Sequence, residues 1–137
     1  MTFSLRYALL MTVLCMLLAA LGVGLNAALA HMSHFTEQAL RSLHFALNIQ
    51  QYHLLVIIGL GMLSYITHEL GLRRGIIIIQ TLFFVGISLF SGTIYLKYLA
   101  SITTFSFLTM YGGLLLIGSW VLMSACVLIY CIKGRAR

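Results

Sequence analysis

Long apolar runs, separated by short polar stretches, make up almost the whole chain. The runs cover about residues 7–30, 52–70, 75–98 and 108–132. A helix rises 1.5 Å per residue and a hydrocarbon core is about 30 Å thick, so each run is long enough to cross a membrane as a helix. The pattern predicts an all-α integral membrane protein, with residues 1–137 forming a single bundle of four transmembrane helices.

Polar residues recur with helical spacing between the first two runs. Glu37, Arg41 and His44 follow one another at intervals of three and four, whereas Leu40 and Leu43 occupy another face. A helix of this kind lies along the membrane surface with its apolar side down. The sequence therefore predicts a short interfacial amphipathic helix over about residues 35–50, which links the first two spans and is too polar to cross.

Composition and charge narrow the class of protein further. Apolar residues make up 62% of the chain and charged residues only 7%. A soluble domain of this composition would have too few polar residues to cover its surface. The net charge of +6 comes from basic residues scattered at the ends of the runs. This scattered distribution favours anionic lipid headgroups as the partner and argues against binding to nucleic acid. The chain has two acidic residues, so we expect no carboxylate-pair chemistry and no enzyme.

The basic residues also predict an orientation. Those at one end of the spans are Arg6, Arg73, Arg74, Lys133, Arg135 and Arg137, and those at the other end are Arg41 and Lys97. With the protein in the inner membrane of a bacterial cell, the positive-inside rule places both termini in the cytoplasm.

The first run has a second interpretation as a cleavable signal peptide. Arg6, the apolar centre and the small residues Ala28 and Ala30 resemble such a segment. The run is longer than the apolar part of a signal peptide, and Ala20, Gly24 and Ala28 repeat at four-residue spacing, which is typical of a helix-packing face. We therefore expect the segment to be retained as the first span.

Small residues gather in the third span, between residues 86 and 96. Ser88 and Gly92 are four apart, as are Ser91 and Tyr95, so a helix places a shallow groove beside an aromatic ring. Helices in lipid pack closely through such grooves, and Phe83 on the same span is expected to face lipid. The full set of expected helix-packing residues is Ala20, Gly24, Ala28, Ser88, Ser91, Gly92, Gly112 and Gly113.

A family resemblance is carried by these residues and their neighbours. The run Leu89-Phe90-Ser91-Gly92-Thr93-Ile94-Tyr95-Leu96, then Gly112-Gly113 and Trp120, and upstream Gln50-Gln51-Tyr52-His53, resembles the domain-of-unknown-function 423 family. These are YgdD-like small bacterial inner-membrane proteins, similar to mitochondrial transmembrane protein 256. The resemblance covers about residues 20–125. It implies a four-helix membrane fold with the first span retained, and it brings no activity or cofactor.

This chain departs from the family pattern at two places. The segment from Gly24 to Leu29 lacks the histidine usual near the end of the first span, and His31 stands two positions later. Met110 replaces the proline expected in the fourth span. The displaced His31 weakens the case for a shared role of a first-span histidine.

Histidines are the main candidates for chemistry, because ionisable groups in a membrane are functional candidates by default. His53 is expected at the non-cytoplasmic rim, together with Lys97, His31, His34 and His44. Histidines on one rim could bind a divalent metal or, with His31 opposite His53, a haem iron. Histidine is also common at the membrane interface, so we expect no metal and no cofactor.

Two functions fit these observations. The first is a non-enzymatic accessory or scaffolding subunit that packs against itself or in a larger membrane complex through its small residues. The alternative is a binder or carrier of a small apolar or lipid-like molecule within the bundle. Retention of a stoichiometric ligand, or of another protein, on purification distinguishes the two.

The predicted orientation can be tested by labelling. Cysteine placed at Ser101 is expected to react with an impermeant thiol reagent added from outside, because the loop after the third span is on the non-cytoplasmic side. Cysteine placed at Arg73 is expected to stay unlabelled. Labelling of the Arg73 position alone would mean that the orientation is inverted.

Overall fold

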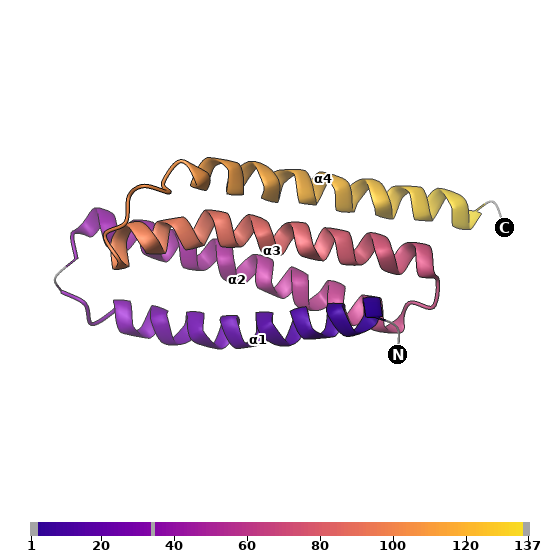
Figure 1. The fold of residues 1–137 in the computed structure, drawn as a ribbon, viewed down its shortest axis with the longest axis horizontal. Helices are drawn as coiled ribbons and strands as arrows, with labels where there is room; N and C mark the ends of the chain where they lie inside the picture. The colour runs from indigo at the N-terminus through magenta and orange to yellow at the C-terminus, as the bar shows by residue number, and fades with distance from the viewer. Residues whose placement is uncertain (1–2, 34, 136–137) are drawn as a thin grey trace.

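Four long helices form the protein in its computed structural model, which describes residues 3–33 and 35–135. They are α1 (Phe3–Leu29), α2 (Glu37–Ile66), α3 (Leu70–Leu99) and α4 (Leu108–Arg135). All four are long and apolar enough to cross a membrane. The start of α1 and the end of α4 lie at the same end of the bundle (Figure 1), as an even number of spans requires.

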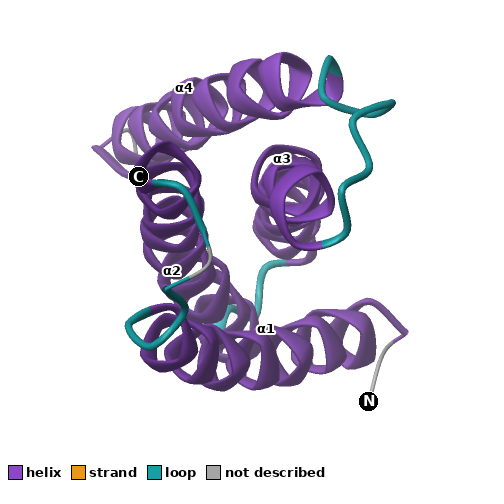
Figure 2. Cartoon of the chain, turned by 90° about the vertical axis from the view of Figure 1, so that its left-hand side faces the viewer, coloured by secondary structure: helices purple, strands orange, loops and turns teal. Residues whose placement is uncertain are grey.

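Helix α3 is the centre of the arrangement. Seen along the bundle, α4, α2 and α1 surround it on three sides (Figure 2). The backbone of α3 packs closely against α2 and α4, whereas α1 packs mainly against α2 and approaches α3 only briefly. The position of α3 means that most of its faces meet another helix, so its sequence is apolar nearly all round.

Helix α2 is continuous where a break was expected. Its start is capped by Thr36, whose side chain accepts a hydrogen bond from the backbone N–H of Ala39 at 3.2 Å. From Glu37 it runs for 30 residues, or about 45 Å, without interruption. The separate interfacial helix over residues 35–50 is therefore not present, because this segment and the second span form a single helix.

The amphipathic pattern in the first half of α2 reflects packing against other helices. Leu43 and Leu47 are buried and form a cluster with Leu29 at the end of α1, and Tyr95 and Tyr98 of α3 pack against it. The apolar face that suggested contact with lipid is thus covered by protein. Glu37 and Arg41 lie on the outer face as an exposed ion pair of 2.7 Å.

Phe83 lies in the middle of the main core, not toward lipid as expected. It is fully buried and packs in a cluster that includes Cys15, Leu54, Ile57 and Leu116. The expectation was wrong because an apolar helix gives no pattern from which an outer face can be distinguished, and α3 is covered on most sides.

Glycines bring the backbones of α3 and α4 close together. A Cβ atom on Gly112 would lie 2.5 Å from the backbone nitrogen of Phe90 and 2.9 Å from the carbonyl oxygen of Gly86. A Cβ on Gly86 would meet the side chain of Leu116 at 2.7 Å. Gly113 has more room, since its nearest neighbour is the ring of Phe90 at 3.6 Å. Gly112 therefore lies at a backbone-to-backbone contact, as expected for a helix-packing residue.

The expected contact through Ser88 and Gly92 is not made by the helices of this chain. Ser88 is exposed, and nothing lies within 4 Å of a Cβ built on Gly92. The reason is that α1 and α3 diverge at this level. On α1, Gly24 also has open space around it, and Ala20 and Ala28 are exposed.

The close contact at Gly112 can be tested with a pair of alanine variants in α4. Gly112→Ala is expected to lower the free energy of unfolding by about 1–3 kcal/mol, because the added methyl group meets the α3 backbone, which cannot move aside easily. Gly118→Ala is the control, since nothing lies within 4 Å of its Cβ position. It should be neutral or stabilising by up to about 1 kcal/mol, as alanine favours helix. Thermal unfolding in detergent measures both, and equal stability of the two variants would contradict the close contact.

Candidate functional site

Gln80, in the middle of α3, joins three helices through its side chain. It is fully buried, and its amide nitrogen donates to the carbonyl oxygens of Ala8 in α1 and Ile57 in α2, each at 3.3 Å. The same nitrogen lies 3.4 Å from the hydroxyl of Thr12. Gly61 leaves the space that the Thr12 hydroxyl occupies, because a Cβ there would overlap Thr12 Oγ1 and would also lie 3.1 Å from the Gln80 nitrogen. Gln80 Oε1 is buried and has no hydrogen-bond partner among the described residues.

His53 and Trp120 form a second buried polar contact. His53 Nδ1 donates to the carbonyl oxygen of Ile49 at 2.7 Å, and Nε2 accepts from the indole N–H of Trp120 at 3.2 Å. Both bonds require the neutral ring with its proton on Nδ1. The Phe83 ring lies edge-on to Trp120, with 5.3 Å between centroids, and completes the cluster. Because the backbones of α2 and α4 stay apart along their described length, Trp120 joins α4 to α2 here.

The position of His53 corrects the expectation that it lies at the membrane rim. It is about 24 Å along α2 from Glu37, near the middle of the helix. The rim position followed from starting the second span at residue 52. Since α2 begins at Glu37, the same residue lies well inside the bundle.

The structure does not bring together His31 and His53, the two histidines considered as metal or haem ligands. His31 is exposed in the turn after α1, far from His53, so the two do not face each other. His44 Nδ1 lies 3.0 Å from Asn26 Oδ1, and His34 is outside the described residues. Within the part of the chain that the structure describes, no three His, Cys, Asp or Glu side chains come together.

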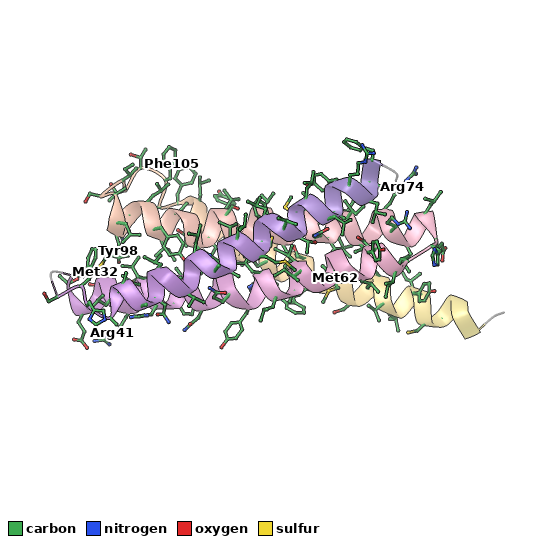
Figure 3. The ribbon with its side chains drawn as sticks, turned by 90° about the horizontal axis from the view of Figure 1, so that it is seen from below. Met32, Arg41, Met62, Arg74, Tyr98 and Phe105 are labelled. Atoms are coloured by element: carbon green, nitrogen blue, oxygen red, sulfur yellow. The ribbon has the colours of Figure 1, made fainter. Side chains whose placement is uncertain are left out.

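An open groove lies between two helices of the described bundle. It has a volume of about 520 Å³ and lies where α1 and α3 diverge, with α2 behind it. Figure 3 shows α1 running obliquely across the other helices. Leu18, Leu21 and Leu25 of α1 form one wall, and Ile87 of α3 belongs to the other. Ser88, Gly92 and Tyr95 also line it, so the small residues predicted to pack against a helix line an open groove instead.

The floor of the groove carries hydrogen-bonding groups. The Tyr95 hydroxyl donates to Gln50 Oε1 at 2.9 Å. This bond leaves the Gln50 amide nitrogen, for which we find no acceptor among the described residues, beside the hollow. The neighbouring Gln51 has its own partner, since its nitrogen donates to the carbonyl oxygen of Ala19 at 3.0 Å above Gly22.

The remaining candidate residues have structural positions. Ser91 is buried, and its hydroxyl donates to the carbonyl oxygen of Ala46 at 2.8 Å, so it joins α3 to α2. Phe90 packs edge-on against Phe45 with 6.0 Å between ring centroids. Tyr52 points outward and is mostly exposed.

Two glutamines are the interior and groove-lining polar residues to which sequence reasoning assigned no role. Gln50 was used only as part of a family motif, and Gln80 was not considered. A signal was available, because a primary amide inside an apolar run is costly in lipid unless it finds partners. Gln80 follows four consecutive isoleucines, which makes its polar side chain conspicuous.

These features define a multi-pass membrane protein, a four-helix bundle whose polar side chains pair across the interior. The family model described as Protein of unknown function (DUF423) matches residues 25–113. The chain therefore belongs to the DUF423 family, as its motifs indicated. The match includes His53, Gln80 and Tyr95 and ends before Trp120. Neither the curated proteins nor the solved structures compared with the chain give a match.

The bond between Trp120 and His53 can be tested by removing the indole N–H. Trp120→Phe is expected to lower the free energy of unfolding by about 1–3 kcal/mol, because it leaves His53 Nε2 buried without a donor and shortens a packed ring. Tyr111→Phe, which removes a hydroxyl from an exposed aromatic of the same helix, should change stability by less than about 0.5 kcal/mol. Thermal unfolding in detergent compares the two. A Trp120→Phe variant as stable as Tyr111→Phe would show that the bond does not hold α4 to α2.

Proposed function

We propose that the protein is a non-enzymatic component of a bacterial inner membrane, with both termini in the cytoplasm, that binds a lipid-like amphiphile in the groove between α1 and α3. The observation that carries this proposal is the groove itself, with its apolar walls and its hydrogen-bonding floor at Gln50 and Tyr95. Its volume of about 520 Å³ is in the usual range for small-molecule sites.

The floor supports an amphiphile rather than a simple hydrocarbon. An apolar chain gains little by leaving lipid for an equally apolar wall, since lipid tails already solvate it. A free amide N–H₂ is different, because a polar group without a partner in a medium of low dielectric constant is costly. A ligand with a carbonyl or hydroxyl oxygen at one end would accept a hydrogen bond from Gln50. Its apolar chain would lie along Leu18, Leu21 and Leu25.

The groups along the groove favour binding over reaction. The Ser88 hydroxyl donates to the carbonyl oxygen of Phe84 within its own helix, at 2.8 Å. Tyr95 already donates to Gln50. The lining includes no histidine, cysteine, lysine or carboxylate among the described residues, so no acid–base or nucleophile pair stands beside the hollow.

A scaffolding subunit is the second candidate, and a different surface favours it. Ala20, Gly24 and Ala28 are exposed on α1, and Gly24 has open space where a Cβ would lie. Such a face allows a helix of another copy, or of another subunit, to approach closely in lipid. The two candidates differ in what purification would retain, which is an amphiphile in one case and a second polypeptide in the other.

The groove can be tested by filling it. Gly92→Leu places a large side chain in the hollow, and nothing lies within 4 Å of its Cβ position, so the variant should fold normally and lose the ligand. Gly118→Leu adds the same side chain at an open position of α4, outside the groove, and should retain it. Native mass spectrometry of protein purified gently from its own membrane is expected to show an amphiphile at about one per chain in the parent and in Gly118→Leu, reduced at least about tenfold in Gly92→Leu.

Two outcomes would contradict the binding function. One is a parent protein that carries no amphiphile, and the other is equal retention by the Gly92 variant. If the parent protein instead has the mass of several polypeptides and carries no bound lipid, this result would support the scaffolding function.

A further inference from the structure

A second, smaller hollow lies at the end of the bundle opposite the termini. It has a volume of about 230 Å³ and is formed by the first half of α2, the end of α3, and the residues around the start of α4. In Figure 3, Tyr98, Arg41 and Phe105 mark this end of the molecule. Five of its eight lining residues carry a hydroxyl group, namely Ser42, Thr93, Tyr98, Ser106 and Thr109.

One cation stands at this hollow without a counter-charge. Lys97 belongs to the lining, and its ammonium lies 5.0 Å from the centroid of the Tyr98 ring. The chain has two carboxylates. Glu37 is paired with Arg41 at 2.7 Å, and Glu69 precedes α3 at the opposite end of the bundle. No carboxylate therefore lines the hollow, and the field there is positive.

One hydroxyl group at the hollow also has no hydrogen-bond partner. Ser106 Oγ is buried and has no partner among the described residues. The other hydroxyls have partners within the protein. Ser42 donates to the carbonyl oxygen of Gln38 at 2.9 Å, and Thr93 donates to that of Leu89 at 2.7 Å. Thr109 Oγ1 lies 2.6 Å from Thr93 Oγ1 and donates to it. Ser106 lies in the turn before Leu108, where the first N–H groups of α4 add a positive partial charge.

Taken together, an ammonium without a carboxylate partner and a buried hydroxyl without a hydrogen-bond partner match the chemistry of a phosphate group, which offers several acceptor oxygens and negative charge. We propose that this hollow binds the phosphate headgroup of an anionic phospholipid. Lys97 supplies the charge, and Ser106 donates a hydrogen bond to a phosphate oxygen.

The position of the hollow favours a lipid over a free phosphate ion. It lies at the ends of membrane-spanning helices, at the level where headgroups are found. Phe45 and Ile94 supply an apolar side to the same lining, against which the first carbons of an acyl chain would lie. A zwitterionic headgroup fits less well, because its own cation would lie close to Lys97.

The experiment compares short-chain phosphatidylglycerol with phosphatidylcholine of the same chain length, titrated against the purified full chain in detergent and followed by native mass spectrometry. The parent protein is expected to bind phosphatidylglycerol about tenfold more tightly, as one charge-assisted hydrogen bond predicts. Lys97→Gln should remove this preference, and Ser106→Ala should weaken phosphatidylglycerol binding by about threefold. Arg41→Gln is the matched control, because it removes a cation from the same end without touching the hollow, and it should bind as the parent does.

The same titration with inorganic phosphate separates the two sources of the phosphate group. We expect inorganic phosphate not to compete at the concentrations at which the lipid saturates. Equal binding of the two lipids, equal effects of Lys97→Gln and Arg41→Gln, or inorganic phosphate binding as tightly as the lipid would each overturn the proposal. Because this hollow and the α1–α3 groove share no lining residue, its failure would leave the groove proposal standing.

Discussion

The hydrogen bonds of Gln80 are the interaction on which the arrangement of this bundle depends. A primary amide in the hydrocarbon region must find partners inside the protein, since lipid supplies none. Gln80 finds them in carbonyl oxygens of α1 and α2, and so fixes three helices at one level. Tyr7 and Thr81, whose hydroxyls lie 3.1 Å apart, add a second link between α1 and α3 nearby.

The shape of the rest follows from where these links are placed. Both of them lie in the half of α1 that contains Tyr7, Ala8 and Thr12, so α1 is held against α3 only there. Beyond that point α1 follows α2, to which Gln51 and the pair of His44 and Asn26 attach it. The two helices therefore separate toward the other end, and the groove is the space that they leave. On the far side of α3, the contact at Gly112 holds α4 close to α3. The hydrogen bond from Trp120 to His53 then links α4 to α2.

The number of spans could be predicted from the sequence, because apolar length alone decides whether a helix can cross a membrane. The start of α2 could not, since the polar residues after Glu37 indicated a separate helix. Which face of a helix meets protein could not. The leucine face of α2 was interpreted as lipid-facing and is covered by α1 and α3. The same limit explains Phe83, which is buried in the core, and Gly92, which is open. Spacing shows that residues share a face, but the partner of that face depends on how the helices cross.

Unsatisfied polar atoms show why the groove, and not the most buried amide, is the candidate binding site. Gln80 Oε1 is buried and has no partner among the described residues, whereas Gln50 lines the groove, so the two amides differ in access. Gln80 is enclosed on all sides, so its free oxygen can be reached only by a water molecule or a rearrangement of the helices around it. Gln50 stands beside a hollow that is open between two helices, so a molecule from the membrane can reach it. Polar groups inside the membrane need partners. At Gln80 these partners are backbone groups of neighbouring helices, which holds the bundle together, and at Gln50 the open groove leaves room for a ligand to be the partner.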